Sequence, residues 1–214
     1  MRKRTHLAVV SSTAPVPVNG TLAGSPRRQP NKAARTREHL TPEEVQRLVA
    51  AAGKRGRYRQ RDATLILLTY RHGLRVGELV SLQWSQVDLK TGLLHVSRLK
   101  NGLPSTHPLQ GPELRALRQL QRDQQPPSPY LFTTERLASM TTVGVRRLIA
   151  RVGQAAKFPF PVHPHMLRHA CGFKLANDGQ NTRAIQQYLG HRNITHTVRY
   201  TELAPGRFKD FWKD

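Results

Sequence analysis

Apolar residues recur with regular spacing only after about residue 38 of this 214-residue chain. The segment before that point is rich in Ser, Thr, Ala, Pro and Gly, and most of its charged residues are basic. Such a segment buries too little apolar surface to offset the entropy lost on ordering. We therefore predict a disordered basic arm over residues 1–38 and a folded domain over residues 39–204.

Three helices begin the predicted domain. Segment 41–44 (TPEE) places Thr as an N-cap, Pro at the first helical position and Glu at the third, which is a strong helix start. Apolar residues at positions 45, 48, 49 and 52 then mark one face of that helix. A second helix is expected over residues 59–72, where Gly73 ends it, and Arg75 opens a third, short one.

The pattern then changes to that of strands. Residues 84–89 lead through a turn at 90–92 (KTG) into a second strand over 93–98. Segment 100–102 (KNG) is a hairpin signal, and residues 106–109 form the returning strand.

Helical spacing returns after the hairpin and continues to the end of the domain. Five further helices are expected over residues 112–122, 141–155, 164–177, 181–189 and 194–203. The predicted fold is therefore mainly α with a small antiparallel β-sheet. A Pro-Gly break at 205–206 separates a C-terminal segment, 205–214, in which Phe208, Phe211 and Trp212 have helical spacing.

The net charge of the chain limits the kinds of molecule that it could bind. The chain carries a net charge of +22 and a pI near 11.5, which indicates a polyanion. A membrane is the weaker alternative, since no apolar run approaches the roughly 20 residues that span a bilayer. Cys171 is the single cysteine and is expected in the core; zinc-type spacing and a signal peptide are absent from the sequence, so an intracellular, cytosolic setting is expected.

Several polar residues could bind phosphate or react with it, although each also has an ordinary structural explanation. His165 and Arg168 lie three apart on a helix that begins at Pro164, so they share one face near its positive end. Taken alone, a histidine and an arginine at this spacing are more often a pair on the surface of a helix. Arg75 with Glu78 three residues later reads as a local ion pair, and Tyr200 as a half-buried core residue.

The order of these residues along the chain is more specific than any one of them. Arg75, Lys100, His165-x-x-Arg168, His191 and Tyr200 follow one another in the order of the catalytic set of the tyrosine recombinase (phage-integrase) family, which this chain resembles. The segments 70–75 (YRHGLR), 98–102 (RLKNG), 106–109 (THPL), 163–169 (HPHMLRH) and 188–194 (YLGHRNI) resemble the short fimbrial phase-variation invertases in particular.

The resemblance implies a tyrosine recombinase catalytic-domain fold and a covalent mechanism. Tyr200 would attack the scissile phosphate and form a 3′-phosphotyrosyl link, with no metal or other cofactor. Arg75 and Arg168 would clamp the nonbridging oxygens. Lys100 would protonate the leaving 5′-oxygen, and His165 would assist proton transfer with Tyr200.

Two further roles follow from the resemblance. His191 would hydrogen-bond the phosphate, and Glu78 would orient Arg75 or a histidine. Arg146, Arg147 and Arg151 are candidates for DNA contact.

The expected partners are double-stranded DNA, three further copies of the chain in a tetramer on paired sites, and DNA-bending accessory proteins. The basic arm either lies along DNA phosphates or has no part in binding. The C-terminal segment packs on its own chain or, as in the family, on a neighbouring protomer.

Three activities remain open at this point. The first is a site-specific recombinase that inverts or integrates a DNA segment. The second is a DNA-binding regulator that keeps the fold but rarely cuts, and the third is topoisomerase-like relaxation. The complete set through Tyr200 favours the recombinase.

Overall fold

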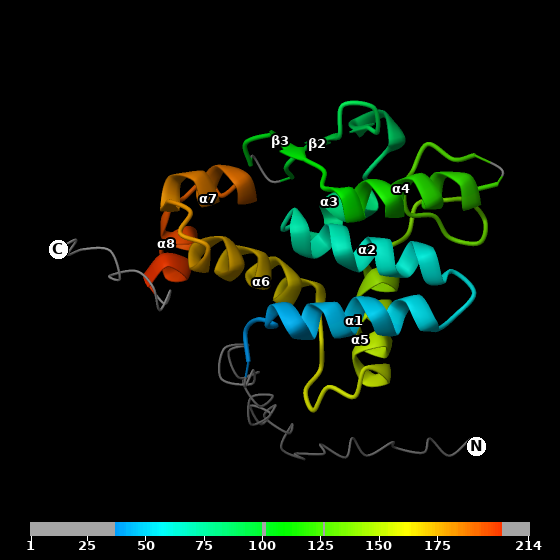
Figure 1. Ribbon diagram of the computed structural model, residues 1–214, viewed down its shortest axis with the longest axis horizontal. Coiled ribbons are helices and arrows are strands. Elements are labelled where there is room, and N and C mark those ends of the chain that lie inside the picture. Colours follow the sequence, from blue (N-terminus) through cyan, green and yellow to red (C-terminus); the bar gives the residue numbers. More distant parts are fainter. Residues whose placement is uncertain (1–36, 100–101, 126, 203–214) are drawn as a thin grey trace, which may run out of the picture. The chain divides into compact units, whose positions relative to one another are not determined.

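The computed structural model describes residues 37–99, 102–125 and 127–202. The predicted arm over 1–38 lies almost wholly outside these residues, as does the C-terminal segment 205–214. In the described part, eight helices and a three-stranded antiparallel sheet follow one another along the chain, which confirms the predicted fold class (Figure 1). No helix in this part is long and apolar enough to cross a membrane.

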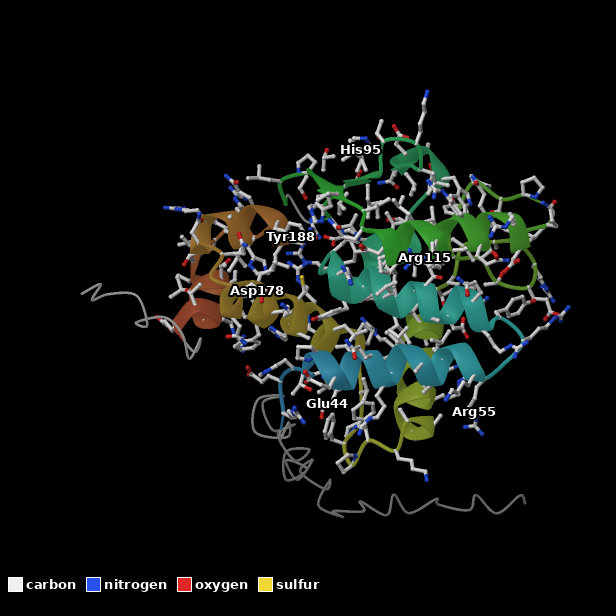
Figure 2. All side chains as sticks on the ribbon, in the orientation of Figure 1. Glu44, Arg55, His95, Arg115, Asp178 and Tyr188 are labelled. Atoms are coloured by element: carbon white, nitrogen blue, oxygen red, sulfur yellow. The ribbon has the colours of Figure 1, made fainter. Side chains whose placement is uncertain are left out.

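Helix α1 (Pro42–Lys54) begins as its sequence predicts. The Thr41 side chain accepts a hydrogen bond from the Glu44 backbone N–H, and the Glu44 side chain accepts one from the Thr41 N–H, so both ends of the capping box are present. Figure 2 labels Glu44 at this end of the helix and Arg55 just after the other end.

Helix α2 (Arg59–Arg71) is the central element of the domain. It lies between α1 and α4 (Gly111–Asp123) and also contacts α6 (Pro164–Asn177). Gly73 has φ +55°, a left-handed conformation that lets the chain turn directly after α2 into α3 (Val76–Val80). Apolar side chains from α1 to α6 meet in one large core around α2.

The sheet is shorter than predicted at its first strand. Strand β1 is only Val87–Asp88, because Trp84–Gln86 forms a single 3-10 turn in place of a strand. The Trp84 N–H bonds to the carbonyl of Pro129, and the Gln86 side chain accepts a hydrogen bond from the Gln83 N–H. These bonds hold residues 83–86 in the turn, so they do not extend the strand.

Strands β2 (Leu93–Val96) and β3 (Ser105–Pro108) pair antiparallel, with Leu94 opposite His107. The tip that joins them, including Lys100, lies outside the described residues.

The last helices form a second, smaller apolar cluster. Helix α5 (Thr142–Ala155) packs on α1, α3 and α6, whereas α7 (Thr182–Leu189) and α8 (Thr195–Glu202) pack at one end of α6 (Figure 1). The second cluster lies between α6, α7 and α8 and consists of Cys171, Phe173, Ala176, Ile185, Leu189 and Tyr200. Cys171 is thus a core residue, as predicted, and burial raises the pKa of its thiol to about 12.

Candidate active site

Arg168 lies on the inward face of α6, where it joins the ends of two other helices. Its guanidinium donates to the Gly73 carbonyl after α2 and, at 2.7 Å, to the Leu189 carbonyl at the end of α7. The residue is 2 % exposed, and burial lowers its pKa to about 10. It therefore remains a cation at neutral pH, and within the described part of the chain it is bonded to neutral carbonyls and to no carboxylate.

Arg75 is fixed by the carboxylate of Glu78 at the start of α3. The Arg75 backbone N–H donates to one Glu78 oxygen at 2.8 Å, and its Nη1 donates to the other at 2.7 Å. Arg98 donates to the same carboxylate at 2.9 Å. Burial alone would raise the pKa of Glu78, but the hydrogen bond from the Arg75 N–H and the charge of Arg98 outweigh it and lower that pKa.

His191 follows a left-handed turn at the end of α7. Gly190 has φ +64° and caps the helix, and the next residue, His191, is 8 % exposed. Its Nδ1 lies 2.8 Å from the Thr197 hydroxyl oxygen in α8. Burial and the nearby charges of Arg168 and Arg75 lower the pKa of His191 to about 3, so the imidazole is neutral at pH 7.

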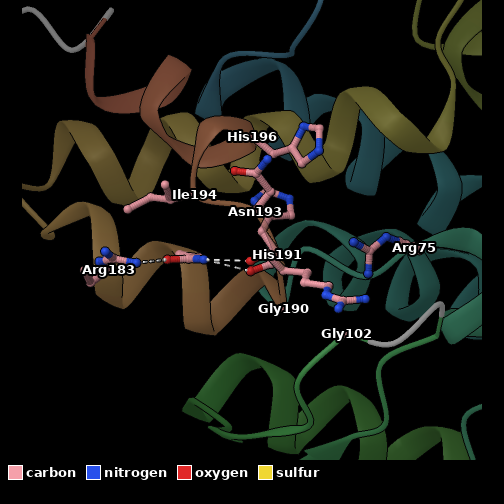
Figure 3. Close-up of a pocket in the computed structure, with 10 residues that line it drawn as sticks. Arg75, Gly102, Arg183, Gly190, His191, Asn193, Ile194 and His196 are labelled. Carbon is pink, nitrogen blue, oxygen red and sulfur yellow. Dashed lines mark hydrogen bonds between the residues drawn. The ribbon is translucent and has the colours of Figure 1, made fainter.

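An open cleft lies between these elements (Figure 3). Its volume is about 670 Å³, and Figure 3 shows Arg75 and His191 along it. Among the described residues, those that line it include no acidic side chain; they are Arg75, Gly102, Arg183, Gln186, Gly190, His191, Arg192, Asn193, Ile194 and His196. A cleft with several cations and no carboxylate in its lining suits a phosphate group.

Tyr200 lies on α8 and is not among the residues that line this cleft. It is 1 % exposed, and its hydroxyl oxygen is 2.8 Å from Nδ1 of His169. The Tyr200 ring lies against Gly172 and meets Phe173 edge to face at 5.0 Å between centroids, and the His191 ring is 6.4 Å away. Burial raises the pKa of the Tyr200 hydroxyl to about 12.

The structure brings four of the predicted site residues together: Arg75, Arg168, His191 and Tyr200 lie at the junction of α2, α3, α6, α7 and α8. Glu78 contacts Arg75, as expected. His165 lies one turn before His169 on α6, with 4.2 Å between the two ring centroids. Lys100 lies outside the described residues, so its place remains a prediction.

For the remaining residues, the sequence pattern was less specific evidence of a role. Arg146, Arg147 and Arg151 are exposed on α5, and none of them lines the cleft. Sequence reasoning missed Arg98 and His169, which contact Glu78 and Tyr200 respectively. The position of His169 within segment 163–169, four residues after His165, was the only signal for it.

Comparison with known proteins identifies the family. A model of the phage integrase family matches residues 38–207. The type 1 fimbriae regulatory protein FimE of Escherichia coli K12 is 41 % identical over 184 residues, which is 83 % of this chain and 91 % of FimE. FimB of the same strain is 41 % identical over 180 residues, with 82 % and 90 % covered.

Solved structures share the fold. The crystal structure of XerA recombinase has a TM-score of 0.70 and 28 % identity, and the match covers 83 % of this chain and 64 % of that one. XerH recombinase bound to its difH substrate after cleavage has a TM-score of 0.69 at 20 % identity, over 83 % of this chain and 53 % of XerH. The resemblance stated from the sequence is confirmed: the chain belongs to the tyrosine recombinase, or phage integrase, family.

Proposed function

We propose that this protein is a site-specific recombinase that cuts and rejoins double-stranded DNA through a covalent link to Tyr200, and that its product is an inverted or integrated DNA segment. The observation that carries this proposal is the convergence of Arg75 and His191, which line a cleft with no acidic side chain among its described residues, with the buried Arg168 and Tyr200 next to them. The DNA-bound state of XerH supports the choice of DNA as substrate.

In the proposed reaction, the Tyr200 oxygen attacks phosphorus while the bond to the 5′-oxygen breaks. Arg75 and Arg168 neutralise charge on the nonbridging oxygens as the phosphorus becomes five-coordinate. Lys100 gives its proton to the leaving 5′-oxygen, and His165 accepts the proton of Tyr200. The 5′-hydroxyl of a partner strand then attacks the phosphotyrosine and restores a phosphodiester, so no external energy source is needed.

His191 has a separate role in this scheme. Because its pKa is lowered to about 3, the imidazole stays neutral and binds the phosphate by a hydrogen bond without adding charge. Glu78 orients Arg75 through the two hydrogen bonds that join them.

Attack also requires a change at Tyr200. A hydroxyl in a residue that is 1 % exposed cannot contact a phosphate in the neighbouring cleft. In this scheme the Tyr200 ring therefore leaves its contact with Gly172 when DNA binds, and the cations around the phosphate lower the pKa of the phenol from about 12.

Two larger features belong to the same proposal. Four copies act together on paired sites, and DNA-bending proteins assist them. The protein works where its DNA is, in the cytoplasm and on the nucleoid. Light scattering of the protein on a two-site DNA checks the stoichiometry, and a mass of one or two protomers in the recombining complex contradicts the tetramer.

Covalent capture tests the chemistry. The wild-type protein is incubated with a pool of nicked duplexes of randomised sequence, and the DNA that stays attached under denaturing conditions is sequenced. A single enriched site is expected, and the Tyr200→Phe protein is the matched control. If the wild type captures no more DNA than that control, cleavage through Tyr200 is wrong.

The captured site then separates the alternatives. Two copies of it on one circular DNA yield inverted products with a recombinase, and copies on two DNA molecules yield joined ones. They yield only relaxed topoisomers with a topoisomerase-like enzyme. Tight binding of this site without any adduct would favour the DNA-binding regulator.

A further inference from the structure

Arg98 is a buried cation that joins three parts of the site. It lies two residues after the end of β2, and its side chain is 0 % exposed. One nitrogen, Nη1, donates to Glu78 at 2.9 Å. The other, Nη2, donates to the Tyr188 carbonyl in α7 and, at 3.4 Å, to the His72 carbonyl after α2.

Two glycines allow the stem of Arg98 to lie where it does. A Cβ on Gly190 would come within 2.6 Å of the Arg98 Cγ and 2.8 Å of its Nε. A Cβ on Gly102 would come within 2.7 Å of the Arg98 Cβ and 3.0 Å of the Gly190 carbonyl oxygen. The stem is therefore packed against the turn that precedes His191, and any larger residue at either position would displace it.

The α7 side of this junction is itself fixed. The Tyr188 hydroxyl donates to the Arg71 carbonyl at 2.9 Å, so α7 is tied to the end of α2 one residue from where Arg98 is bound (Figure 2). Arg98 thus holds Glu78 on one side and a rigid helix end on the other. That helix end leads directly into His191.

The Glu78 carboxylate is shared between two guanidinium groups of different exposure. The Arg75 side chain is 31 % exposed and lines the cleft, whereas Glu78 is 1 % exposed and Arg98 is enclosed. With Arg98 in place, the Oε2 atom of Glu78 accepts from both Arg98 and the Arg75 N–H, and Oε1 remains directed at the Arg75 Nη1. Without Arg98, the carboxylate loses the one fully buried cation that it contacts among the described residues. Oε2 then keeps only the Arg75 N–H, and Oε1 keeps the Arg75 Nη1 and the Leu99 N–H at 3.3 Å, so the rotation of Glu78 is less firmly fixed.

We propose that Arg98 is a positioning residue for phosphate binding: it fixes the rotation of Glu78, and through Glu78 it directs the Arg75 guanidinium into the cleft opposite His191. This inference rests on the proposed function, because it assigns Arg98 to the binding of the scissile phosphate. Arg98 does not touch the phosphate; it acts through Arg75.

The test uses two versions of one nicked substrate, built on the site found by covalent capture. The first has an ordinary scissile phosphodiester. The second has a methylphosphonate there, in which a methyl group replaces one charged nonbridging oxygen. A cation directed at that oxygen matters on the first substrate and much less on the second, because the charge to be neutralised is gone. Arg75→Ala provides the reference pattern.

Arg98→Met is expected to slow adduct formation on the phosphodiester by about 100-fold, the loss typical of one misplaced oxyanion donor. On the methylphosphonate, relative to wild type, the loss should be under about 10-fold. Arg118→Met is the control, since Arg118 is an exposed arginine that donates to the Leu89 carbonyl outside the site, and its rates should equal those of wild type on both substrates.

Arg98→Lys covers the case in which Arg98→Met does not fold. Lysine keeps the buried charge, but it cannot reach Glu78 and the Tyr188 carbonyl with one planar fork, so Glu78 is less firmly fixed. The same difference between the two substrates is expected, with smaller losses.

Three results would overturn the inference. Equal losses on both substrates would mean that Arg98 only supports the fold, and wild-type rates in a folded Arg98 variant would mean that it has no part in the reaction. No adduct from the wild type would instead refute the proposed function, and the inference with it.

Discussion

The Tyr200 ring lies directly on a glycine of α6, and this contact can be changed by one methyl group. A Cβ built on Gly172 would be 2.6 Å from Cε2, 2.7 Å from Cζ and 2.8 Å from Cδ2 of Tyr200, where ordinary contacts begin at 3.4 Å. Gly172 lies inside a 14-residue helix that is packed on both sides, so the backbone cannot retreat. In Gly172→Ala we expect the Tyr200 ring to move instead.

The free energy of unfolding should fall by about 1–3 kcal/mol. Alanine in a helix interior is favoured over glycine by about 1 kcal/mol. Against this, an extra methyl in a packed core costs about 1–3 kcal/mol. A displaced ring also breaks the 2.8 Å hydrogen bond between the Tyr200 hydroxyl and His169, which costs about 1 kcal/mol. The two losses together exceed the gain in helix propensity.

Gly53→Ala is the matched control for that arithmetic. Gly53 also lies within a helix, α1, and the nearest atom to its Cβ would be the Ala63 Cβ at 4.0 Å. Alanine there gains helix propensity without a clash, so this variant should be more stable than wild type by up to about 1 kcal/mol. Urea unfolding of the three proteins measures both changes.

Nitration mapped by mass spectrometry shows whether the ring has moved. Tyr200 of the wild type should resist nitration, because the reagent needs an accessible phenolate and the hydroxyl is enclosed with its pKa raised to about 12. In Gly172→Ala, Tyr200 should react and its pKa should fall toward the ordinary value near 10. If Gly172→Ala is as stable as Gly53→Ala and its Tyr200 stays unreactive, the buried position of the Tyr200 ring against Gly172 is wrong.

Four more predictions concern Arg168, two buried histidines and the start of α1. Arg168→Ala should abolish adduct formation while DNA affinity in a gel-shift assay changes little, because many other cations carry the affinity; a parallel loss of affinity would contradict this. The same variant leaves two carbonyls without a donor and should lower the free energy of unfolding by about 2–4 kcal/mol in urea titrations. As the pH falls from about 6.5 to about 5, His169 and His191 take up protons in the unfolded chain but stay neutral in the folded protein, where their pKa values are about 2 and 3. The free energy of unfolding should therefore fall by up to about 1.4 kcal/mol per pH unit for each histidine. A free energy of unfolding that stays constant over this range would refute the lowered pKa values. Thr41→Ala should cost about 1 kcal/mol in thermal unfolding through loss of the N-cap, and no change would mean that the capping box is weak.

The helices could be predicted from the sequence because their starts and ends are encoded locally. Thr41 before α1, Gly73 after α2 and Gly190 after α7 each act through the few residues beside them. The first strand was predicted, but its short extent could not be, since Trp84–Gln86 is held in a turn by a hydrogen bond to Pro129, which is far away in the sequence. Local propensity does not contain that bond.

The same division holds at the site. Family order singles out Arg75, Arg168 and Tyr200, and the structure brings them to one junction. Arg98 could not be found in this way, because its partners Glu78 and Tyr188 lie 20 and 90 residues away along the chain. The burial of Tyr200 also could not be predicted. It depends on the packing of α6, α7 and α8 against one another, and the sequence pattern alone indicated only a half-buried side chain.

The charges at this junction explain why the site is suited to a phosphate before any DNA is present. Three guanidinium groups, those of Arg75, Arg98 and Arg168, lie close together: burial and the charges of Arg75 and Arg98 lower the pKa of Arg168. Glu78 is the only carboxylate that contacts any of them among the described residues. Arg168 is bonded only to carbonyls, which hold it in place without cancelling its charge. Burial strengthens the attraction of that uncancelled charge for an anion. A phosphate in the cleft would supply the negative charge that this junction lacks. In the proposed reaction, the uncancelled charge of Arg168 therefore stabilises the attacked phosphorus, while cations elsewhere on the chain carry most of the affinity for DNA.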